Sequence, residues 1–339
     1  MMPIVTRKLA ITLAGVALLL ALLALARVLM YYQHLDQPLH LQQDYLLEVG
    51  QGSNLTRVLT RLEQEAIIPS AFDLRLYARL TLPDMTLQAG EYLLQPGLSA
   101  RAFLDKLDRA DVLYHQVRLQ EGWTLEQALR ALQAQPTIKP VLNDVLDLQQ
   151  RLGLDSYPEG LFFPDTYRYV KGTTDLELLR RAQALMSEVM TQVWEERDAG
   201  LPYANPYEML VMASIIEKET AVNAERFQIA GVFVRRLQRN MRLQTDPTVI
   251  YGLGAGFDGN LTRAHLQSDT PWNTYTRPGL PPTPIALPGR AALEASVHPD
   301  DGETLYFVSR GDGSHYFSTT LQEHNDAVRR YQLGGGATP

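Results

Sequence analysis

The sequence predicts an α+β protein with a single N-terminal transmembrane helix, a small α+β region and a larger α+β domain. Three observations lead to this prediction. An uncharged apolar run occupies residues 9–26, a strand–turn–helix pattern occurs three times between residues 45 and 135, and helical and strand-like segments are mixed in the remainder. The 339 residues are 45% hydrophobic and 20% charged, an ordinary globular mixture that is long enough for about two domains.

Composition also excludes several classes of function. With 31 Lys+Arg against 38 Asp+Glu the formal charge is −7, which argues against nucleic acid as a partner because phosphate backbones require a basic surface. The chain has no Cys, so disulfides and thiolate metal sites are ruled out. The seven His show no HExxH or HxxxH spacing, and we expect neither a metal nor a cofactor.

The apolar run is the first element in chain order. We predict a cytoplasmic tail at residues 1–8 and a transmembrane anchor at 9–32, because Arg7 and Lys8 favour a cytoplasmic N-terminus. Arg27 interrupts the run near its end, where its side chain can reach the membrane interface. Ala24-Leu25-Ala26 resembles a signal-peptide cleavage site, but the run exceeds the usual length of a signal sequence. The remaining chain would then lie outside the cytoplasmic membrane.

Residues 33–43 read as a polar linker, and residues 44–135 as an α+β region. Here a β-type run is followed three times by a glycine, by a capping residue two positions later and by an amphipathic helix. Chance recurrence of a common strand–turn–helix pattern has equal weight. The runs are Tyr45–Val49, Gly90–Leu94 and Leu113–Leu119, the glycines Gly52, Gly97 and Gly122, and the capping residues Asn54, Ser99 and Thr124.

Residues 136–333 are predicted to form the larger domain, followed by a disordered tail at 334–339. Helices are expected at about 174–197, 207–220 and 224–239, and a strand pair at 305–309 and 315–317 before a last helix from Thr320. A Pro-rich and aromatic stretch at 157–166 reads as a structured loop. Residues 241–300 show little regular periodicity.

Two carboxylates at the end of an apolar helix are the first chemical signal. In an α-helix Glu217 and Glu219 point about 200° apart, so they cannot face the same site. Glu219 shares its strip with Ile215, Ile216 and Met212, and partial desolvation there would raise its pKa and suit a general acid. The alternative is that both glutamates mark a solvated helix end and pair with Lys218 or Arg226.

Two further segments hold candidate substrate-binding residues. Gln244, Thr245 and Asp246 lie beside a strand-like stretch, and Asp246 is either a second carboxylate or, preferably, the cap of a turn before Pro247. In the Pro-rich segment 271–288, Trp272 and Tyr275 offer flat faces for sugar rings and Asn273 and Thr274 offer hydrogen-bond donors, unless the loop is a rigid cover on the core. The full candidate set is Glu217, Gln244, Thr245, Asp246, Tyr251, Trp272, Asn273, Thr274 and Tyr275.

Several motifs resemble the endolytic murein transglycosylases of the MltG type. They are Ala213–Thr220 (ASIIEKET), Met241–Gly252 (MRLQTDPTVIYG), Asn273–Tyr275, Gly279–Pro282, His324-Asn325, Glu121-Gly122 and Pro164–Thr166. The strand–helix–helix–strand order from Tyr45 to Leu94 also resembles a LysM module, a small glycan-binding domain, although a packing domain without a ligand is equally compatible. The essential glutamate of the transglycosylase family is the second Glu of the EKET motif, which falls on Glu219.

The resemblance implies a single-pass inner-membrane protein of bacteria whose catalytic domain faces the periplasm. It would cleave nascent peptidoglycan glycan strands internally, leave 1,6-anhydro-N-acetylmuramic ends and set strand termination during wall synthesis. The expected partners are glycan strands, inner-membrane lipid and peptidoglycan synthases. A lytic reaction needs one carboxyl group, whereas hydrolysis generally needs two. The alternatives are therefore a hydrolytic muramidase using Glu219 with Asp246, and a non-catalytic glycan-binding scaffold.

Overall fold

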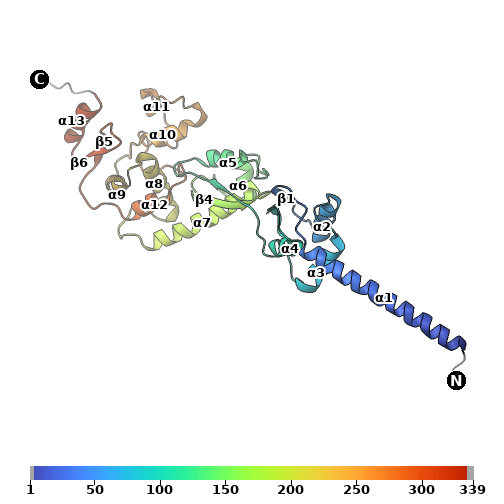
Figure 1. The fold of residues 1–339 in the computed structure, drawn as a ribbon. Helices are drawn as coiled ribbons and strands as arrows, with labels where there is room; N and C mark the ends of the chain where they lie inside the picture. The colour runs from blue at the N-terminus through green and yellow to red at the C-terminus, as the bar shows by residue number, and fades with distance from the viewer. Residues whose placement is uncertain (1–3, 334–339) are drawn as a thin grey trace. The chain divides into compact units, whose positions relative to one another are not determined.

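A computed structural model of the chain describes residues 4–333. It confirms the α+β class, with one long apolar helix at the N-terminus (Figure 1). The chain divides into two compact units, one formed by residues up to 115 together with 169–172, the other by 116–168 and the residues from 173 onward. The predicted domain boundaries stay predictions, and both the disordered tail at 334–339 and the first three residues of the cytoplasmic tail fall outside the described residues.

The first unit is built from an N-terminal helix and a small βααβ arrangement followed by one more helix. Strands β1 and β2 pair antiparallel, with Tyr45 opposite Leu94 and Val49 opposite Gly90. This confirms the predicted element order. The elements are α1 (Ile4–Asp36), β1 (Tyr45–Val49), α2 (Leu55–Gln64), α3 (Ala71–Thr81), β2 (Gly90–Leu94) and α4 (Ala100–Asp108).

The recurring pattern of the sequence folds as expected at its turns and caps. Asn54 and Ser99 accept hydrogen bonds from the amides three residues later and so begin α2 and α4. Gly97 has a φ of 89°, which is accessible to glycine and strained for other residues. The core of this unit also includes Leu35 and Leu39, which are 1% and 3% exposed, so the segment 33–43 is packed where the sequence suggests a linker.

The second unit is mainly helical. Its long helix α7 and the helices α8, α9 and α12 surround one apolar core. Strands β3 and β4 pair with each other, as do β5 and β6. Strands β3 (Tyr114–Arg118) and β4 (Thr166–Val170) lie only partly in this unit. Its other elements are α5 (Leu125–Gln133), α6 (Val145–Leu152), α7 (Asp175–Glu195), α8 (Pro206–Glu219), η1 (Asn223–Glu225), α9 (Arg226–Gln238), α10 (Asp246–Leu253), η2 (Gly254–Gly256), α11 (Arg263–Gln267), α12 (Arg290–Val297), β5 (Tyr306–Ser309), β6 (His315–Ser318) and α13 (Leu321–Tyr331).

Residues 241–300 are more regular in the structure than their weak sequence periodicity indicates. This stretch contains α10, α11 and α12. Five of the eight residues of α12 are buried, between Ala292 and Val297, and its polar side consists of only the paired Arg290 and Glu294, so a helix this short gives a weak periodic signal. Helix α10 has Pro247 in its first turn, a position that tolerates proline because the missing amide proton has no partner there.

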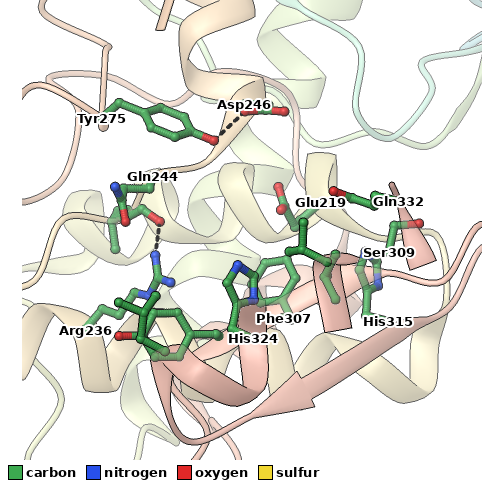
Figure 2. Close-up of a pocket in the computed structure, with 15 residues that line it drawn as sticks. Glu219, Arg236, Gln244, Asp246, Tyr275, Phe307, Ser309, His315, His324 and Gln332 are labelled. Atoms are coloured by element: carbon green, nitrogen blue, oxygen red, sulfur yellow. Dashed lines mark hydrogen bonds between the residues drawn. The ribbon is translucent and has the colours of Figure 1, made fainter. Parts of the chain in front are cut away.

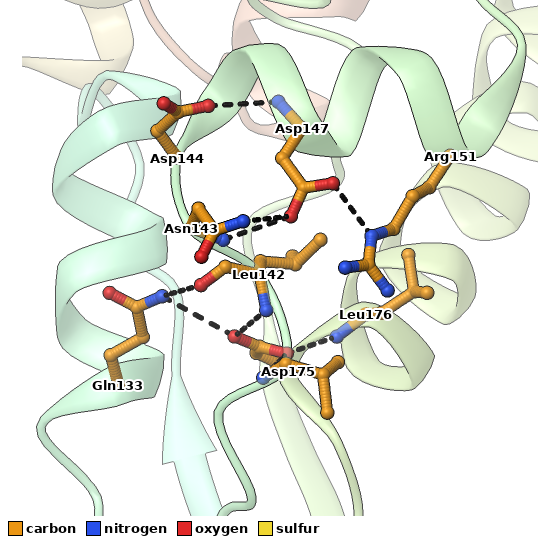
Figure 3. A network of polar contacts seen from close by, with 9 residues as sticks. Gln133, Leu142, Asn143, Asp144, Asp147, Arg151, Asp175 and Leu176 are labelled. Carbon is orange, nitrogen blue, oxygen red and sulfur yellow. Dashed lines mark hydrogen bonds and ion pairs between the residues drawn. The ribbon is translucent and has the colours of Figure 1, made fainter.

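A buried carboxylate fixes the start of α7. Asp175 is fully buried and accepts hydrogen bonds from the amides of Val141, Leu142 and Leu176 and from Gln133 Nε2 (Figure 3). Its position in the first turn also suits the positive end of the helix dipole. The loop before α6 is thereby attached to the long helix of this unit, which makes that loop a structured segment.

Helix α8 is the central element of this unit. Every residue from Met209 to Ile216 is buried, so the helix is apolar on all sides and is enclosed by α7, α9 and α12. Asn205 caps its N-terminus through the amide of Glu208, and the helix ends at Glu219. Because the core encloses α8 along its length, the directions in which Glu217 and Glu219 point are fixed.

Candidate active site

A pocket of about 450 Å³ opens at the end of α8 in the second unit (Figure 2). Glu219 projects into it from α8, and the β5–β6 hairpin with α13 forms the opposite wall. The segment between α9 and α10 and the Pro-rich loop supply the rest of the lining. The residues around the pocket are Glu219, Arg236, Leu243, Gln244, Asp246, Tyr275, Tyr306, Phe307, Val308, Ser309, His315, Leu321, His324, Val328 and Gln332.

Glu219 is a partly buried carboxyl group with one defined hydrogen bond. Thr245 Oγ1 donates to Glu219 Oε2 at 2.9 Å. Burial raises the pKa of Glu219 to about 7, while the Thr245 bond acts to lower it. The charge of Asp246 also raises this pKa, and the charges of His315 and Arg236 lower it. Desolvation of Glu219, which the apolar strip on α8 predicts, is therefore present in the structure.

Asp246 is a second carboxylate in the pocket and does not cap a turn. It is the first residue of α10, whose N-cap is Thr245, and its Oδ1 accepts a hydrogen bond of 2.6 Å from Tyr275 Oη. Gln244, next to it, has a φ of 53°, which is uncommon for a residue other than glycine and places local strain at the pocket. The cap interpretation that the sequence favours is wrong.

Two candidate residues of the Pro-rich loop lie behind the pocket wall. Asn273 is fully buried, donates to the carbonyls of His265, Leu266 and Ser268, and accepts from the amide of Tyr275. Its hydrogen-bonding groups are thus occupied within the protein.

Thr274, also buried, accepts a hydrogen bond from the Thr245 amide at 3.1 Å, and its carbonyl accepts from the Gln244 amide. The loop therefore fixes the backbone of the segment that carries Gln244, Thr245 and Asp246. The sequence places Tyr275, Asn273 and Thr274 in one group of candidate substrate-binding residues. In the structure they are separated, because Tyr275 lines the pocket while Asn273 and Thr274 support its wall.

Glu217 lies away from the pocket, as the 200° argument predicts. Its Oε1 pairs with Arg226 at 3.2 Å and its Oε2 accepts from the Gly289 amide. Burial raises its pKa despite these partners. The pairing with Arg226 that the sequence offers as an alternative holds for Glu217 and not for Glu219.

Tyr251 and Trp272 belong to a different cluster. Their rings meet edge to face at 5.7 Å, and Trp272 Nε1 donates to Thr283 Oγ1. Tyr251 Oη donates at 3.1 Å to Glu159, a carboxyl group that is 1% exposed and also accepts from the amide of Leu125. Burial raises the pKa of Glu159 to about 7. This group of residues is called the Glu159 cluster below, and none of its members lines the pocket.

Sequence reasoning missed an imidazole on the pocket wall. His315 begins β6, and Glu225 accepts hydrogen bonds from both its Nδ1 and its backbone amide, at 2.7 and 2.9 Å. Because Nδ1 is engaged, Nε2 is the ring atom left for a ligand. Ninety positions separate the two residues, so no local spacing could have revealed the pair.

Arg236 and His324 were also missed as neighbours of Glu219. Arg236 is buried and donates to the carbonyls of Leu305 and Leu243 at 2.7 Å, so it fastens β5 to the segment before α10. Its guanidinium lies over the Tyr306 ring, and His324 stacks on that ring at 5.2 Å. Burial lowers the pKa of His324, and within the described residues its Nδ1 is buried without a hydrogen-bond partner. In sequence Arg236 is one of three arginines in α9, so no local signal singles it out.

The family profile described as "YceG-like family" matches residues 47–330, more than half of the chain. The chain belongs to the YceG-like family. A crystal structure of a putative YceG-like protein from Listeria monocytogenes is 29% identical, with a TM-score of 0.52, and the match covers 84% of this chain and 99% of that one. The Glu159 cluster and all the pocket-lining residues except Gln332 lie within the matched residues.

Curated relatives carry a functional name. A Bacillus subtilis protein named endolytic murein transglycosylase is 30% identical over 84% of this chain and 84% of its own length. A Streptococcus pneumoniae protein of the same name is 28% identical over 92% of this chain, which spans 63% of that relative. Among residues 4–333 of this YceG-like chain no three His, Asp or Glu side chains gather as metal ligands would.

Proposed function

We propose that this YceG-like protein is a lytic transglycosylase that cleaves peptidoglycan glycan strands internally, with Glu219 as its catalytic residue. Relatives named endolytic murein transglycosylase along most of the chain favour an enzyme over a scaffold. The observation that carries the assignment of Glu219 is its place in the pocket with a pKa near 7. A carboxyl group with that pKa is present in both protonation states at neutral pH, as an acid that later acts as a base requires.

In the proposed reaction Glu219 first acts as a general acid. Its proton passes to the glycosidic oxygen as the bond to C1 of the N-acetylmuramic residue breaks, which leaves Glu219 ionised and the sugar with oxocarbenium character. Thr245 Oγ1, already hydrogen bonded to Oε2, then stabilises the carboxylate. The Asp246 carboxylate, held by Tyr275 Oη, lies in the same pocket and would stabilise the positive charge on the sugar ring.

Glu219 then acts as a base. It removes the proton from the C6 hydroxyl of the same sugar, and the C6 oxygen attacks C1 to close a 1,6-anhydro ring. The glycosidic bond is broken, the anhydro bond is formed, and Glu219 regains its proton, so no water is consumed. The attack is intramolecular, which gives it a high effective concentration.

Several pocket residues have proposed binding roles. Gln244 and Tyr275 offer polar groups to the glycan, and His315 Nε2 is a further ring atom for a ligand, whereas His324 Nδ1 is buried behind the wall. We propose that Thr274 acts behind them by fixing Thr245, next to Asp246, and that Asn273 does so by fixing the backbone of Tyr275. Glu217, Tyr251 and Trp272 have structural contacts that give them no evident part in binding glycan at this pocket.

A hydrolytic muramidase is the second candidate function, because the pocket holds two carboxyl groups. In that case Asp246 would direct a water molecule to C1, and the product would carry a reducing end. The two products differ by one water molecule. Mass spectrometry of uncrosslinked glycan strands digested by the purified full-length protein decides between them. Anhydro ends that depend on Glu219 support the proposal, and reducing ends overturn the lytic mechanism in favour of hydrolysis.

The remaining proposals concern location. Among the described residues α1 is the one helix long and apolar enough to cross a membrane, and we propose that it anchors the chain in the inner membrane with residues 1–8 in the cytoplasm and the catalytic domain in the periplasm. Cleavage would then act on strands close to the membrane, set their termination and bring peptidoglycan synthases within reach. The βααβ arrangement of the first unit is a proposed LysM-like glycan-binding module.

A further inference from the structure

Helix α3 of the first unit has an exposed apolar face. Phe72, Leu76 and Leu80 are 59%, 37% and 68% exposed, and their spacing of four residues places them along one side of the helix. The opposite side, with Ala71, Leu74 and Ala78, is buried in the core of the unit. An aligned set of large exposed apolar side chains indicates a surface that is covered in the working protein.

The contacts of this face identify what lies next to it. Helix α3 packs beside the C-terminal part of α1 (Figure 1). Arg27 of α1 lies over the Phe72 ring at 5.9 Å and forms an ion pair with Asp73. Asp73 is 1% exposed and also binds His34 Nδ1 at 2.6 Å. Arg27 and His34 are two helical turns apart on α1, so one buried carboxylate fastens α3 to that helix at two points.

These partners also determine the state of Asp73. Burial raises the pKa of this carboxyl group, but the hydrogen bonds from Arg27 and His34 outweigh burial and hold the pKa below its ordinary value. Asp73 is therefore ionised at neutral pH. The charge of the half-exposed Arg27 is thus paired with a buried carboxylate, which explains how an arginine is accommodated near the end of an apolar helix.

The depth of Arg27 follows from the length of the helix. About twenty residues of α-helix span the roughly 30 Å hydrocarbon core of a bilayer. Counted from Leu9, where the uncharged run begins, that distance ends near Val28. Tyr31 and the exposed Tyr32 follow directly and have the position of an interfacial aromatic pair. Phe72, beside Arg27, is thus at the level where acyl chains meet headgroups.

We propose that α3 is a membrane-interface helix whose residues Phe72, Leu76 and Leu80 insert between the lipids of the leaflet facing the periplasm. The proposal rests on the proposed membrane anchor α1. Arg75 and Arg79 on the same helix give it a positive charge that suits the phosphates of anionic lipids. With α1 and α3 both embedded and joined by Asp73, the first unit is held at one height and in one orientation on the membrane surface.

The absence of cysteine in the chain permits a direct test. The full-length protein is reconstituted in vesicles of phosphatidylethanolamine and phosphatidylglycerol, with single cysteines at Leu76, Leu80, Leu19 and Thr56 carrying an environment-sensitive fluorophore. Leu76, Leu80 and Thr56 are exposed, so labelling leaves the core intact. Lipids with a nitroxide at a shallow or a deep acyl position then quench labels that contact lipid.

We expect labels at Leu76→Cys and Leu80→Cys to have blue-shifted emission and to lose most of it to the shallow nitroxide, with less quenching by the deep one. The label at Thr56→Cys on α2 should stay unquenched. If Leu19→Cys is quenched while Leu76→Cys and Leu80→Cys are not, the anchor stands and the interface helix is refuted. A blue shift without quenching identifies a protein occupant and also refutes the proposal. An unquenched Leu19→Cys would refute the anchor itself.

Discussion

Two regions of the second unit each hold a carboxyl group with a pKa near 7, the pocket with Glu219 and the Glu159 cluster. In both, burial is the main cause of the raised pKa. Glu159 is 1% exposed and both its oxygens accept hydrogen bonds from the protein, whereas Glu219 has one such bond and lines an open pocket. A raised pKa therefore marks desolvation, and only access by a substrate separates a candidate acid from a structural carboxyl group.

The largest expected effect contrasts the two residues directly. Glu219→Gln keeps the shape of the side chain but removes the exchangeable proton, so we expect glycan cleavage to fall by about 10³-fold or more. Glu159→Gln should retain cleavage within a few fold, because Gln can still accept from Leu125 and contact Tyr251. Product release from labelled glycan strands measures both.

Melting curves of the two variants serve as the control for folding. If Glu159→Gln abolishes cleavage in a folded protein while Glu219→Gln does not, the assignment of Glu219 as the catalytic residue is wrong.

The second prediction concerns Glu217, which shares α8 with Glu219 but faces Arg226. Both side chains of this pair are almost fully buried, at 6% and 7% exposure. Removing one partner leaves the other charge buried, and we expect Glu217→Gln to lower the free energy of unfolding by about 2–4 kcal/mol. Denaturant titration measures this loss, while activity per folded molecule should change little. A Glu217→Gln protein that is stable yet inactive would contradict the separation of the two glutamates.

The third prediction uses pH to compare the buried carboxyl groups. Folding raises the pKa of Glu219 from 4.5 to about 7. Such a buried carboxyl group lowers the free energy of unfolding only at pH values at which carboxyl groups ionise. Wild-type stability should therefore fall as pH rises between about 4.5 and 7.

Either Glu→Gln variant should reduce that fall, by on the order of 1–3 kcal/mol at pH 8 and by nothing near pH 4. Both variants should thus behave alike in stability although they differ in activity. Melting temperatures across this pH range test the expectation, and a variant that gains equally at pH 4 and pH 8 would exclude desolvation as the cause.

The smallest expected effect concerns the imidazole on the pocket wall. His315→Gln removes a charge that lowers the pKa of Glu219, so the alkaline limb of the activity profile should move to higher pH. We expect a loss of about tenfold in kcat at neutral pH, because the wall also loses a ring atom held in place by Glu225. Glu225→Gln should shift the profile in the same direction. An unchanged pH profile in both variants would show that the pair serves only to fold the hairpin.

A feature of the fold or of the site could be predicted from sequence when the residues that form it lie within a few positions of one another. The capped helices after Asn54, Ser99 and Thr174 follow from side chains that bond amides three residues away. The separation of Glu217 from Glu219 follows from helix geometry alone. The role of Asp246 did not follow, because its partner Tyr275 is 29 positions away and no propensity distinguishes a cap from a pocket carboxylate.

The sequence by itself determined the α+β class, the apolar N-terminal helix, the order of the elements in the first unit and the opposite directions of Glu217 and Glu219 on α8. These depend on periodicity, capping and composition, which act over a few residues. The tertiary structure decided that Gln244, Asp246, Tyr275, Arg236, His315 and His324 surround Glu219, while Glu159, Tyr251 and Trp272 lie apart. It also decided that Asp73 fastens α3 to α1. The physical reason is that such contacts are made across long loops, whose conformations are fixed by packing and hydrogen bonds with distant parts of the chain.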